Sequence, residues 1–345
     1  MRAVTYRSPG GPEVLSLSTR EAAEPGAGEV RVRIVVSAVN PTDWKQRQGG
    51  GVVAAGESGE TVPNQDGAGV VDAIGTGVTG IEVGDRVWVI LAAAYGPASG
   101  TAQEYTVLPA DHVLPLPDGV GFDEGASFAI PGLTAHRALT VAEGGPDRLS
   151  PGALEGTTVL VAGGAGAVGN SAIQLARWAG ATVITTVSTE AKAALAKAAG
   201  AHHVLRYTEP GLEDTIKQLA PDGVDLIVEV AAGVNAELDS RVLRPQGTVA
   251  IYGDDGGNGT VGLSFRASAW VNARYQFVIL YTLGIGELRA GAESISAAMA
   301  AGALAIGEKT GLPIHRFPLA DTASAHAASE NGAVGKVLID VTPAG

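Results

Sequence analysis

An apolar run leads directly into a dense cluster of glycines in the stretch Val159-Leu160-Val161-Ala162-Gly163-Gly164-Ala165-Gly166-Ala167-Val168-Gly169. Gly163, Gly166 and Gly169 have the spacing G-x-x-G-x-x-G, a variant of the fingerprint for dinucleotide binding. The tight turn needs the backbone freedom of glycine, and the N-terminus of a following helix offers N–H groups and a positive dipole end to a pyrophosphate. Taken alone, the motif would also fit a glycine-rich turn with no ligand.

The sequence after this loop favours the ligand-binding interpretation. Strand-length apolar runs alternate with helix-like segments. Such alternation predicts right-handed βαβ units, and therefore a doubly wound parallel sheet with helices on both faces. In that context we identify Ala167 and Val168 as the amide donors to the phosphates. The expected strands are 157–162, 182–187, 203–205, 224–230 and 247–252, and the expected helices are 168–179, 191–199, 212–219 and 235–243.

The tip of the second strand decides which cofactor the loop takes, because an Asp or Glu there would bind the hydroxyls of the adenine ribose. The tip reads Val187-Ser188-Thr189, so it carries no acid that repels a 2′-phosphate. Ser188 offers a hydroxyl donor and Lys192 a positive charge, and we therefore predict NADPH rather than NADH. Two observations oppose this prediction. Lys192 also fits a solvated lysine on the next helix, and the acidic Glu190 follows closely after the strand tip.

Composition limits the class of protein. The chain has 345 residues, 46% of them hydrophobic and 17% charged, which fits a globular protein of two domains. It has no cysteine, which excludes disulfides, thiolate zinc sites and cysteine nucleophiles. A net charge of −13 opposes nucleic acid and acidic membranes as partners, so we expect a small-molecule ligand. Residues 1–6 fit a strand rather than a signal peptide, and we expect a cytoplasmic location.

The two ends of the chain have weaker patterns. Residues 1–122 contain short β-rich runs between Gly, Pro and Asp turns, which predicts a barrel-like β domain. Toward the C-terminus we expect a helix around 293–301 and a final strand at 336–341 that returns to the first domain. An apolar run at 277–281 fits either an internal core strand or an edge strand that pairs with a second copy of the chain.

Seven segments spread over the chain form a recognisable set: Val39-Asn40-Pro41, Asp66–Val71, Gly84–Val87, Ile130–Ala135, the glycine loop, Gly200–Val204 and Gly335–Val337. Together they resemble the medium-chain dehydrogenase/reductase superfamily, and within it the zinc-free NADPH:quinone oxidoreductases related to zeta-crystallin. The resemblance implies an α/β fold. A GroES-like β-rich catalytic domain would span residues 1–125, completed by 284–345, and a Rossmann doubly wound parallel-sheet domain would span 126–283.

The same resemblance implies metal-independent hydride transfer from NADPH to a quinone, and a homodimer formed through the dinucleotide-binding domain. Enoyl and 2-alkenal reductases share nearly all of the seven segments, so reduction of a C=C bond is an alternative. A non-catalytic NADPH-binding protein is a further alternative, since a fold does not guarantee activity.

The chain departs from the zinc-dependent branch of the superfamily at the places of the catalytic metal ligands. By resemblance these places hold Asn40, Gln65 and Ile130, and neither amides nor an apolar side chain suit zinc. The cysteine-rich structural zinc lobe is missing as well. The six histidines are scattered, apart from the neighbours His202 and His203, which point in different directions on a strand. We therefore predict no metal site.

The resemblance also implies the residues of the site. Asn40 is expected to face the nicotinamide and the substrate, although a turn residue before Pro41 would explain it as well. Lys336 is expected near the cofactor phosphates, or else it is a surface charge, and Lys45 stands where some relatives have a tyrosine. The expected cofactor-binding residues are Thr134, Gly163, Gly166, Ala167, Val168, Gly169, Ser188, Lys192, Tyr207, Ala231 and Lys336, and the expected catalytic residues are Asn40, Lys45 and Tyr252.

These residues predict a catalyst that works mainly by position. Negative charge develops on the acceptor oxygen during hydride transfer, and hydrogen-bond donors would stabilise it. The candidate donors lack the triad-like context of a general acid, so water can supply the proton. These donors are Asn40, Lys45, Tyr95 and Tyr252.

Overall fold

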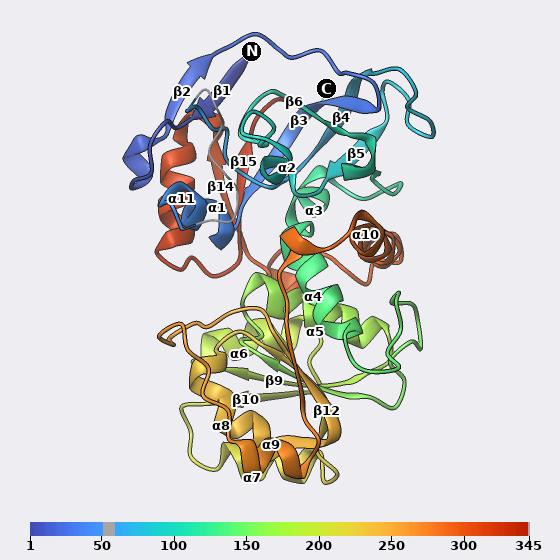
Figure 1. Cartoon of the computed structure of the whole chain (residues 1–345), viewed down its shortest axis with the longest axis vertical. Coiled ribbons are helices and arrows are strands. Elements are labelled where there is room, and N and C mark those ends of the chain that lie inside the picture. Colours follow the sequence, from blue (N-terminus) through green and yellow to red (C-terminus); the bar gives the residue numbers. More distant parts are fainter. Residues whose placement is uncertain (51–58, 344–345) are drawn as a thin grey trace. The chain divides into compact units, whose positions relative to one another are not determined.

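The computed structural model describes residues 1–50 and 59–343, and it divides into two compact units (Figure 1). Unit 1 comprises Met1–Ile130 and Pro313–Gly345, and unit 2 comprises Pro131–Leu312. Unit 1 is β-rich and unit 2 holds a parallel sheet with helices between its strands, so the predicted α/β class is confirmed. Within the described residues, the helices are too short or too polar to cross a membrane.

Unit 1 is built on a seven-stranded sheet in the order β14-β15-β3-β4-β5-β7, with β6 paired to β3. Along β3 (Glu29–Val39) valine alternates with arginine, so Val30 and Val32 are buried while Arg31 and Arg33 are partly exposed. The other strands are β1 (Arg2–Thr5), β2 (Ser16–Thr19), β4 (Asp66–Ile74), β5 (Arg86–Val89), β6 (Tyr105–Pro109), β7 (Val113–Pro115), β14 (Ile314–Pro318) and β15 (Lys336–Asp340). The helices are α1 (Pro41–Arg47), α2 (Ala92–Tyr95), α3 (Phe122–Ser127) and α11 (Thr322–Glu330).

The C-terminal strand completes this sheet, as the sequence predicts. β15 pairs antiparallel with β3 in the register Val337 to Val39, and β14 adds to its other side. One buried cluster of side chains therefore joins segments from opposite ends of the chain: Val4, Val30, Val32, Leu319, Val337 and Ile339 share an apolar core.

Unit 2 is a six-stranded parallel sheet in the order β10-β9-β8-β11-β12-β13. Its chain reverses direction of winding at β8, the strand that carries the glycine loop, as in doubly wound sheets. The strands are β8 (Thr158–Ala162), β9 (Thr182–Val187), β10 (His203–Arg206), β11 (Val224–Glu229), β12 (Leu243–Ile251) and β13 (Arg274–Phe277). The helices are α4 (Ile130–Thr140), which begins at the last residue of unit 1, α5 (Ala167–Trp178), α6 (Glu190–Ala198), α7 (Leu212–Leu219), α8 (Ala232–Val242), α9 (Phe265–Trp270) and α10 (Ile285–Ala300).

The unit limits differ from the predicted domain limits of 125/126 and 283/284. Residues 284–312 belong to unit 2, because α10 and the loop after it bond to α5 and to the segment before β8. The Ser294 hydroxyl accepts from the Leu149 amide at 3.1 Å, and the Ala305 amide donates to Gln174 at 3.0 Å. The helix expected at 293–301 is also longer than predicted, since three glycines near its start hide its periodicity in the sequence.

The apolar run at 277–281 is not itself a strand. β13 ends at Phe277, and a short 3-10 turn follows at Leu280–Thr282. Among the described residues β13 pairs only with β12, so it forms one edge of the sheet.

Candidate active site

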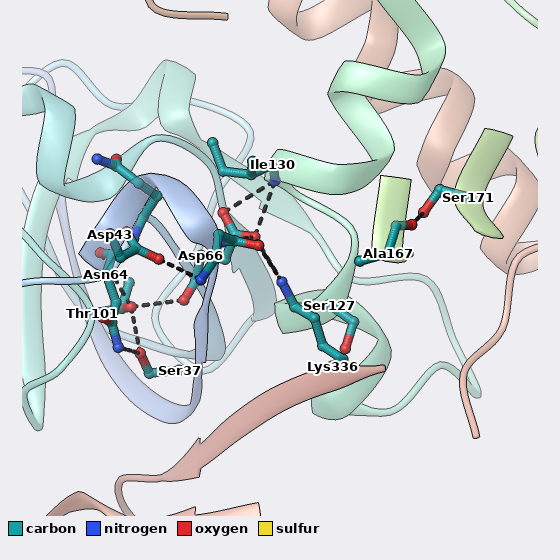
Figure 2. A network of polar contacts seen from close by, with 12 residues as sticks. Ser37, Asp43, Asn64, Asp66, Thr101, Ser127, Ile130, Ala167, Ser171 and Lys336 are labelled. Carbon is teal, nitrogen blue, oxygen red and sulfur yellow. Dashed lines mark hydrogen bonds and ion pairs between the residues drawn. The ribbon is translucent and has the colours of Figure 1, made fainter. Parts of the chain in front are cut away.

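The buried carboxylate of Asp66 is the centre of a polar cluster in unit 1 (Figure 2). The Asn40 Nδ2 donates to Asp66 Oδ2 at 2.8 Å, and the Ile130 amide donates to both carboxylate oxygens at 3.0–3.1 Å. The Lys336 ammonium lies 3.5 Å from Asp66 Oδ2 and donates to Asn40 Oδ1 at 2.5 Å. The side chains of Lys336 and Asp66 are 1% and 0% exposed, so the two charges must compensate each other inside the protein.

Strand pairing brings these residues together. β3 pairs with β4 in the register Ala38 to Asp66, and with β15 in the register Val39 to Val337. Asn40, at the end of β3, therefore lies beside the first residue of β4 and the first residue of β15. Its amide bonds to charged partners, which the alternative of a simple turn residue before Pro41 does not explain.

Asp43 fixes the backbone on which Asn40 sits. It lies in the first turn of α1, where one carboxylate oxygen accepts from the Asn40 amide at 2.7 Å and the other from the Gln65 amide at 3.1 Å. This arrangement joins the N-terminus of α1 to the residues that precede β4. Helix N-termini favour such acidic side chains, because their first N–H groups lack helical acceptors.

A second line of hydrogen bonds holds the backbone of Asp66. The Thr101 hydroxyl donates to the Asp66 carbonyl at 2.7 Å and bonds to the Ser37 hydroxyl at 2.7 Å. Asn64, which has a left-handed φ of 78°, donates to Ser37 at 3.0 Å and bonds to the His326 ring at 2.8 Å. The backbone leading into Asp66 is therefore held on several sides.

Burial sets the protonation of this cluster. It raises the pKa of Asp66, which the nearby Lys336 ammonium counteracts, and it lowers the pKa of Lys336, which the carboxylates counteract. Burial and the charge of Asp66 raise the pKa of Asp43 to about 8. Burial and ion pairing thus act in opposite directions on the pKa of Asp66 and on that of Lys336.

The glycine loop of unit 2 has the geometry that the motif predicts. Gly163 has a φ of 71°, and Gly166 precedes the first turn of α5 in an extended conformation. A Cβ on Gly169 would come 2.4 Å from the Gly163 carbonyl oxygen, so only glycine lets the helix approach the strand this closely. Ala167 and Val168 begin the helix, and their amides lack helical acceptors, which leaves them available to a phosphate. The loop fits the dinucleotide.

The strand tips next to this loop hold more charge than the sequence suggested. Thr189 caps α6 by accepting from the Lys192 amide at 3.3 Å, which places Lys192 in the first turn beside the tip of β9. Arg206 pairs in register with Val187, and its guanidinium lies 3.7 Å from the Glu190 carboxylate. Arg206 also pairs with the Glu209 carboxylate, so its one positive charge is shared between two acids.

Tyr207 and Ser188 also lie at these strand tips. The Tyr207 amide donates to the Val187 carbonyl at 3.1 Å, and its ring is 54% exposed, so it is available to a ligand. Ser188 follows directly after β9 and is partly exposed. The predicted residues Ser188, Lys192 and Tyr207 are thus near one another in unit 2.

The carboxyl ends of β11 and β12 carry a group of acids that sequence reasoning missed. Glu229 accepts from the Ala231 amide and, at 3.1–3.2 Å, from Asn235, so it holds the start of α8. Asp239 lies in α8, and burial together with the Glu229 charge raises its pKa to about 9. The Tyr252 amide donates to the Glu229 carbonyl at 3.0 Å, and burial raises the pKa of the Tyr252 phenol, which therefore stays protonated.

The remaining predicted residues are more scattered. Lys45 is exposed on α1 and lies 5.4 Å from the centre of the neighbouring Trp44 ring. The Tyr95 hydroxyl donates to Glu29 at 2.7 Å, which gives it a surface partner. Thr134 is buried in α4. Within unit 1 the structure thus joins Asn40 to Lys336 and not to Lys45.

Asp66, Asp43 and Arg206 are the clearest residues that the sequence did not single out. Asp66 opens a segment that carried the resemblance, yet nothing in its neighbours along the chain indicates a buried partner. A basic residue one position before Tyr207 was the available signal for Arg206.

Comparisons with known proteins agree with this architecture. Residues 26–118 match the alcohol dehydrogenase GroES-like domain family, and residues 167–297 match the zinc-binding dehydrogenase family. The chain is 32% identical over 346 residues to a quinone oxidoreductase of Lama guanicoe, with 98% of this chain and 97% of that protein covered.

Solved structures of quinone oxidoreductases and alcohol dehydrogenases share this fold. Escherichia coli quinone oxidoreductase complexed with NADPH is similar with a TM-score of 0.78 at 25% identity, covering 99% of this chain and 100% of that one. An NAD-dependent alcohol dehydrogenase has a TM-score of 0.84 at 29% identity, covering 99% and 100%. The fold alone therefore does not decide between the two nicotinamide cofactors.

The residues at the expected metal position do not fit zinc. The Asn40 carbonyl oxygen already accepts from an ammonium, and Gln65 Oε1 accepts from the Ala94 amide at 3.0 Å. Ile130 contributes only its backbone amide, which is a donor. Across residues 1–50 and 59–343, no group of three or more His, Cys, Asp or Glu side chains could hold a metal ion. A cation bonded to the central amide would also repel a metal ion.

The close approach at Gly169 gives a test of the glycine loop. We expect Gly169→Ala to lower the free energy of unfolding by roughly 1–3 kcal/mol, because the new methyl group overlaps the Gly163 carbonyl. It should also weaken NADPH binding at least tenfold, measured by fluorescence titration. In Gly166→Ala the nearest atom to the new Cβ is 3.4 Å away, so this control should unfold at the wild-type denaturant midpoint. Equal stability and affinity in Gly169→Ala and wild type would contradict the assignment.

Proposed function

Because the chain belongs to the quinone oxidoreductase family of the medium-chain dehydrogenase/reductase superfamily, we propose that it reduces quinones with NADPH and without a metal ion. The observation that carries the proposal is the cluster around Asp66, in which a buried ammonium bonds to the amide that stands at a metal-ligand position of the zinc-dependent branch. Quinones need no metal to accept a hydride, because the reduced ring delocalises the added charge.

NADPH, when bound, supplies the hydride. The chain binds the phosphates with the Ala167 and Val168 amides at the start of α5, where the helix dipole favours negative charge. Backbone groups near Ala231 and Tyr252 border the nicotinamide ribose, and Glu229 holds that backbone in place. Asn40 donates a hydrogen bond to the acceptor oxygen as it becomes negative, and water supplies the proton that completes the hydroquinone.

The 2′-phosphate of NADPH is recognised at the tips of β9 and β10. Ser188 and Tyr207 offer hydroxyl groups, and Lys192 offers a positive charge in the first turn of α6. Arg206 adds a positive charge beside Glu190, and it shares that charge with Glu209. These local positive charges are needed because the chain as a whole, with a net charge of −13, repels an anionic cofactor.

The function is tested by the anaerobic rate of NADPH oxidation with an ortho-quinone and with a short 2-alkenal, using protein treated with a chelator. We expect fast turnover of the quinone, a weak rate with the alkenal and little activity with NADH. Preference for the alkenal would move the assignment to C=C reduction. Loss of activity on chelation would contradict metal independence. The absence of NADPH oxidation with both acceptors would contradict the proposed activity.

Lys192 offers a separate test of cofactor choice. We expect Lys192→Ala to raise the KM for NADPH about 10-fold or more, because a charge-assisted contact to the 2′-phosphate is lost. The KM for NADH should stay within about twofold. Lys197→Ala is the matched control, since Lys197 is an exposed lysine later in the same helix. An equal rise for both cofactors would show that Lys192 does not read the 2′-phosphate.

A homodimer is part of the proposal, with a cytoplasmic location as predicted from the sequence. The edge strand β13 supports the dimer, because it can pair with a second copy and because Phe277 and Ile279 at this edge are 60% and 45% exposed. Localisation is testable by cell fractionation alongside the activity assay.

We expect Phe277→Lys to shift the protein from dimer to monomer, because it puts a charge into the proposed strand pairing. The molar mass by light scattering during size-exclusion chromatography measures this. Val83→Lys changes an equally exposed apolar residue of unit 1, at 62%, and should leave the mass unchanged. A monomeric wild type would contradict the proposed dimer directly.

A further inference from the structure

The Asn40 side chain has almost no conformational choice in this structure. Its Oδ1 accepts from the Lys336 ammonium at 2.5 Å, and its Nδ2 donates to Asp66 at 2.8 Å. Turning the amide over would point its NH2 group at an ammonium and its oxygen at a carboxylate, which is unfavourable at both ends. Asn40 is 1% exposed, and among the described residues its second Nδ2 hydrogen has no partner, so this hydrogen is the one donor that the side chain has left.

The ammonium does more than fix the direction of this hydrogen. A positive charge on the amide oxygen draws electron density from the amide nitrogen, which makes the remaining N–H a stronger donor. This effect is larger away from water, and the Lys336 side chain is only 1% exposed. Asp66 keeps the ammonium in place, and the Ile130 amide in turn holds Asp66.

We propose that Lys336 is a positioning residue that acts through Asn40, so that this ammonium, and not a metal ion, strengthens the hydrogen bond to the acceptor oxygen. This inference rests on the proposed quinone reduction. It differs from the role that the resemblance implied, in which Lys336 binds the cofactor phosphates. It also corrects the alternative of a surface charge, since the ammonium is buried beside Asp66 (Figure 2) and donates to Asn40 Oδ1.

The step balances without another reagent. The hydride arrives with its bonding electron pair and forms an O–H bond at one quinone oxygen. The displaced π electrons make the ring aromatic and leave the second C=O group as C–O⁻, the oxygen that receives the hydrogen bond. Asn40 donates a hydrogen bond to that oxygen and keeps its proton. A proton from water then completes the hydroquinone. Lys336 also keeps its proton throughout, because its role is to polarise the amide.

A double-mutant cycle on Lys336→Met and Asn40→Ala tests the inference. We expect Lys336→Met to lower kcat about 10- to 100-fold, as loss of a donor to a developing oxyanion does. The Kd for NADPH, from fluorescence titration without acceptor, should stay within about twofold. In the Asn40→Ala background the same lysine change should alter kcat by less than about twofold, because its effect passes through the missing amide.

Three results would overturn the role of Lys336. A rise of the NADPH Kd by tenfold or more in Lys336→Met would make it a cofactor ligand. If the fold-losses of kcat in the two single variants multiply in the double variant, Lys336 and Asn40 act independently of each other. Wild-type kcat in Asn40→Ala would remove the amide from the reaction. Absence of quinone turnover in the wild type would instead contradict the proposed function itself, so the two failures are distinguishable.

The lysine variant leaves Asp66 buried without its partner, so a folding control is needed. Asp66→Asn/Lys336→Met removes both charges and keeps an amide of similar shape beside Asn40. We expect this pair to unfold at a temperature closer to wild type than Lys336→Met alone, while kcat stays as low as in Lys336→Met. Recovery of wild-type kcat in the uncharged pair would show that the reaction does not need the ammonium, and would overturn the proposal.

Discussion

The pairing of one buried ammonium with one buried carboxylate constrains most of unit 1. Neither Lys336 nor Asp66 can stay charged inside the protein alone, because the cost of removing an ion from water exceeds what a domain can supply. Each must therefore find its partner in the folded state. Their contact draws together the first residue of β4, the first residue of β15 and the residue between β3 and α1. The direction of the Asn40 amide follows from this pair, and the pair in turn requires the strand register that brings the three segments together.

Unit 2 solves a different electrostatic problem. Its ligand is an anion, whereas the chain as a whole is strongly acidic, so attraction has to be local. We propose that helix N-termini provide part of it, at α5 for the phosphates and at α6 for the adenosine end. Near α6, Arg206 lies between the carboxylates of Glu190 and Glu209. Glu229, at the end of β11, has a structural role instead, because its carboxylate accepts from the Ala231 amide directly before α8.

The sequence predicted unit 2 well and unit 1 only in outline. Strand and helix periods along β8 to β12 are local properties, and the glycine spacing reports a local close approach, so both are readable from neighbouring residues. The long helix α10 was underestimated because glycines at its start lower the helical signal. The cluster in unit 1 was not predictable, since Lys336 and Asn40 lie 296 positions apart and ordinary strand sequences surround them. The resemblance indicated both residues as site residues, but it implied that Lys336 lies near the cofactor phosphates. Its burial and its pairing with Asp66 are properties of the folded chain and are not visible in the sequence.

The order of the chain has a consequence for its synthesis. Unit 2 lies between the two segments of unit 1 along the chain, so a ribosome synthesises all of unit 2 before it makes β15. Unit 2 can close its sheet while the polypeptide is still growing, as domains commonly do. The sheet of unit 1 has to wait, with Asp66 hydrated and Val36–Val39 of β3 unpaired on one side, until its last strand emerges. A nascent chain thus exposes an open strand edge for most of its translation, and this is the interval in which a chaperone would have most to protect.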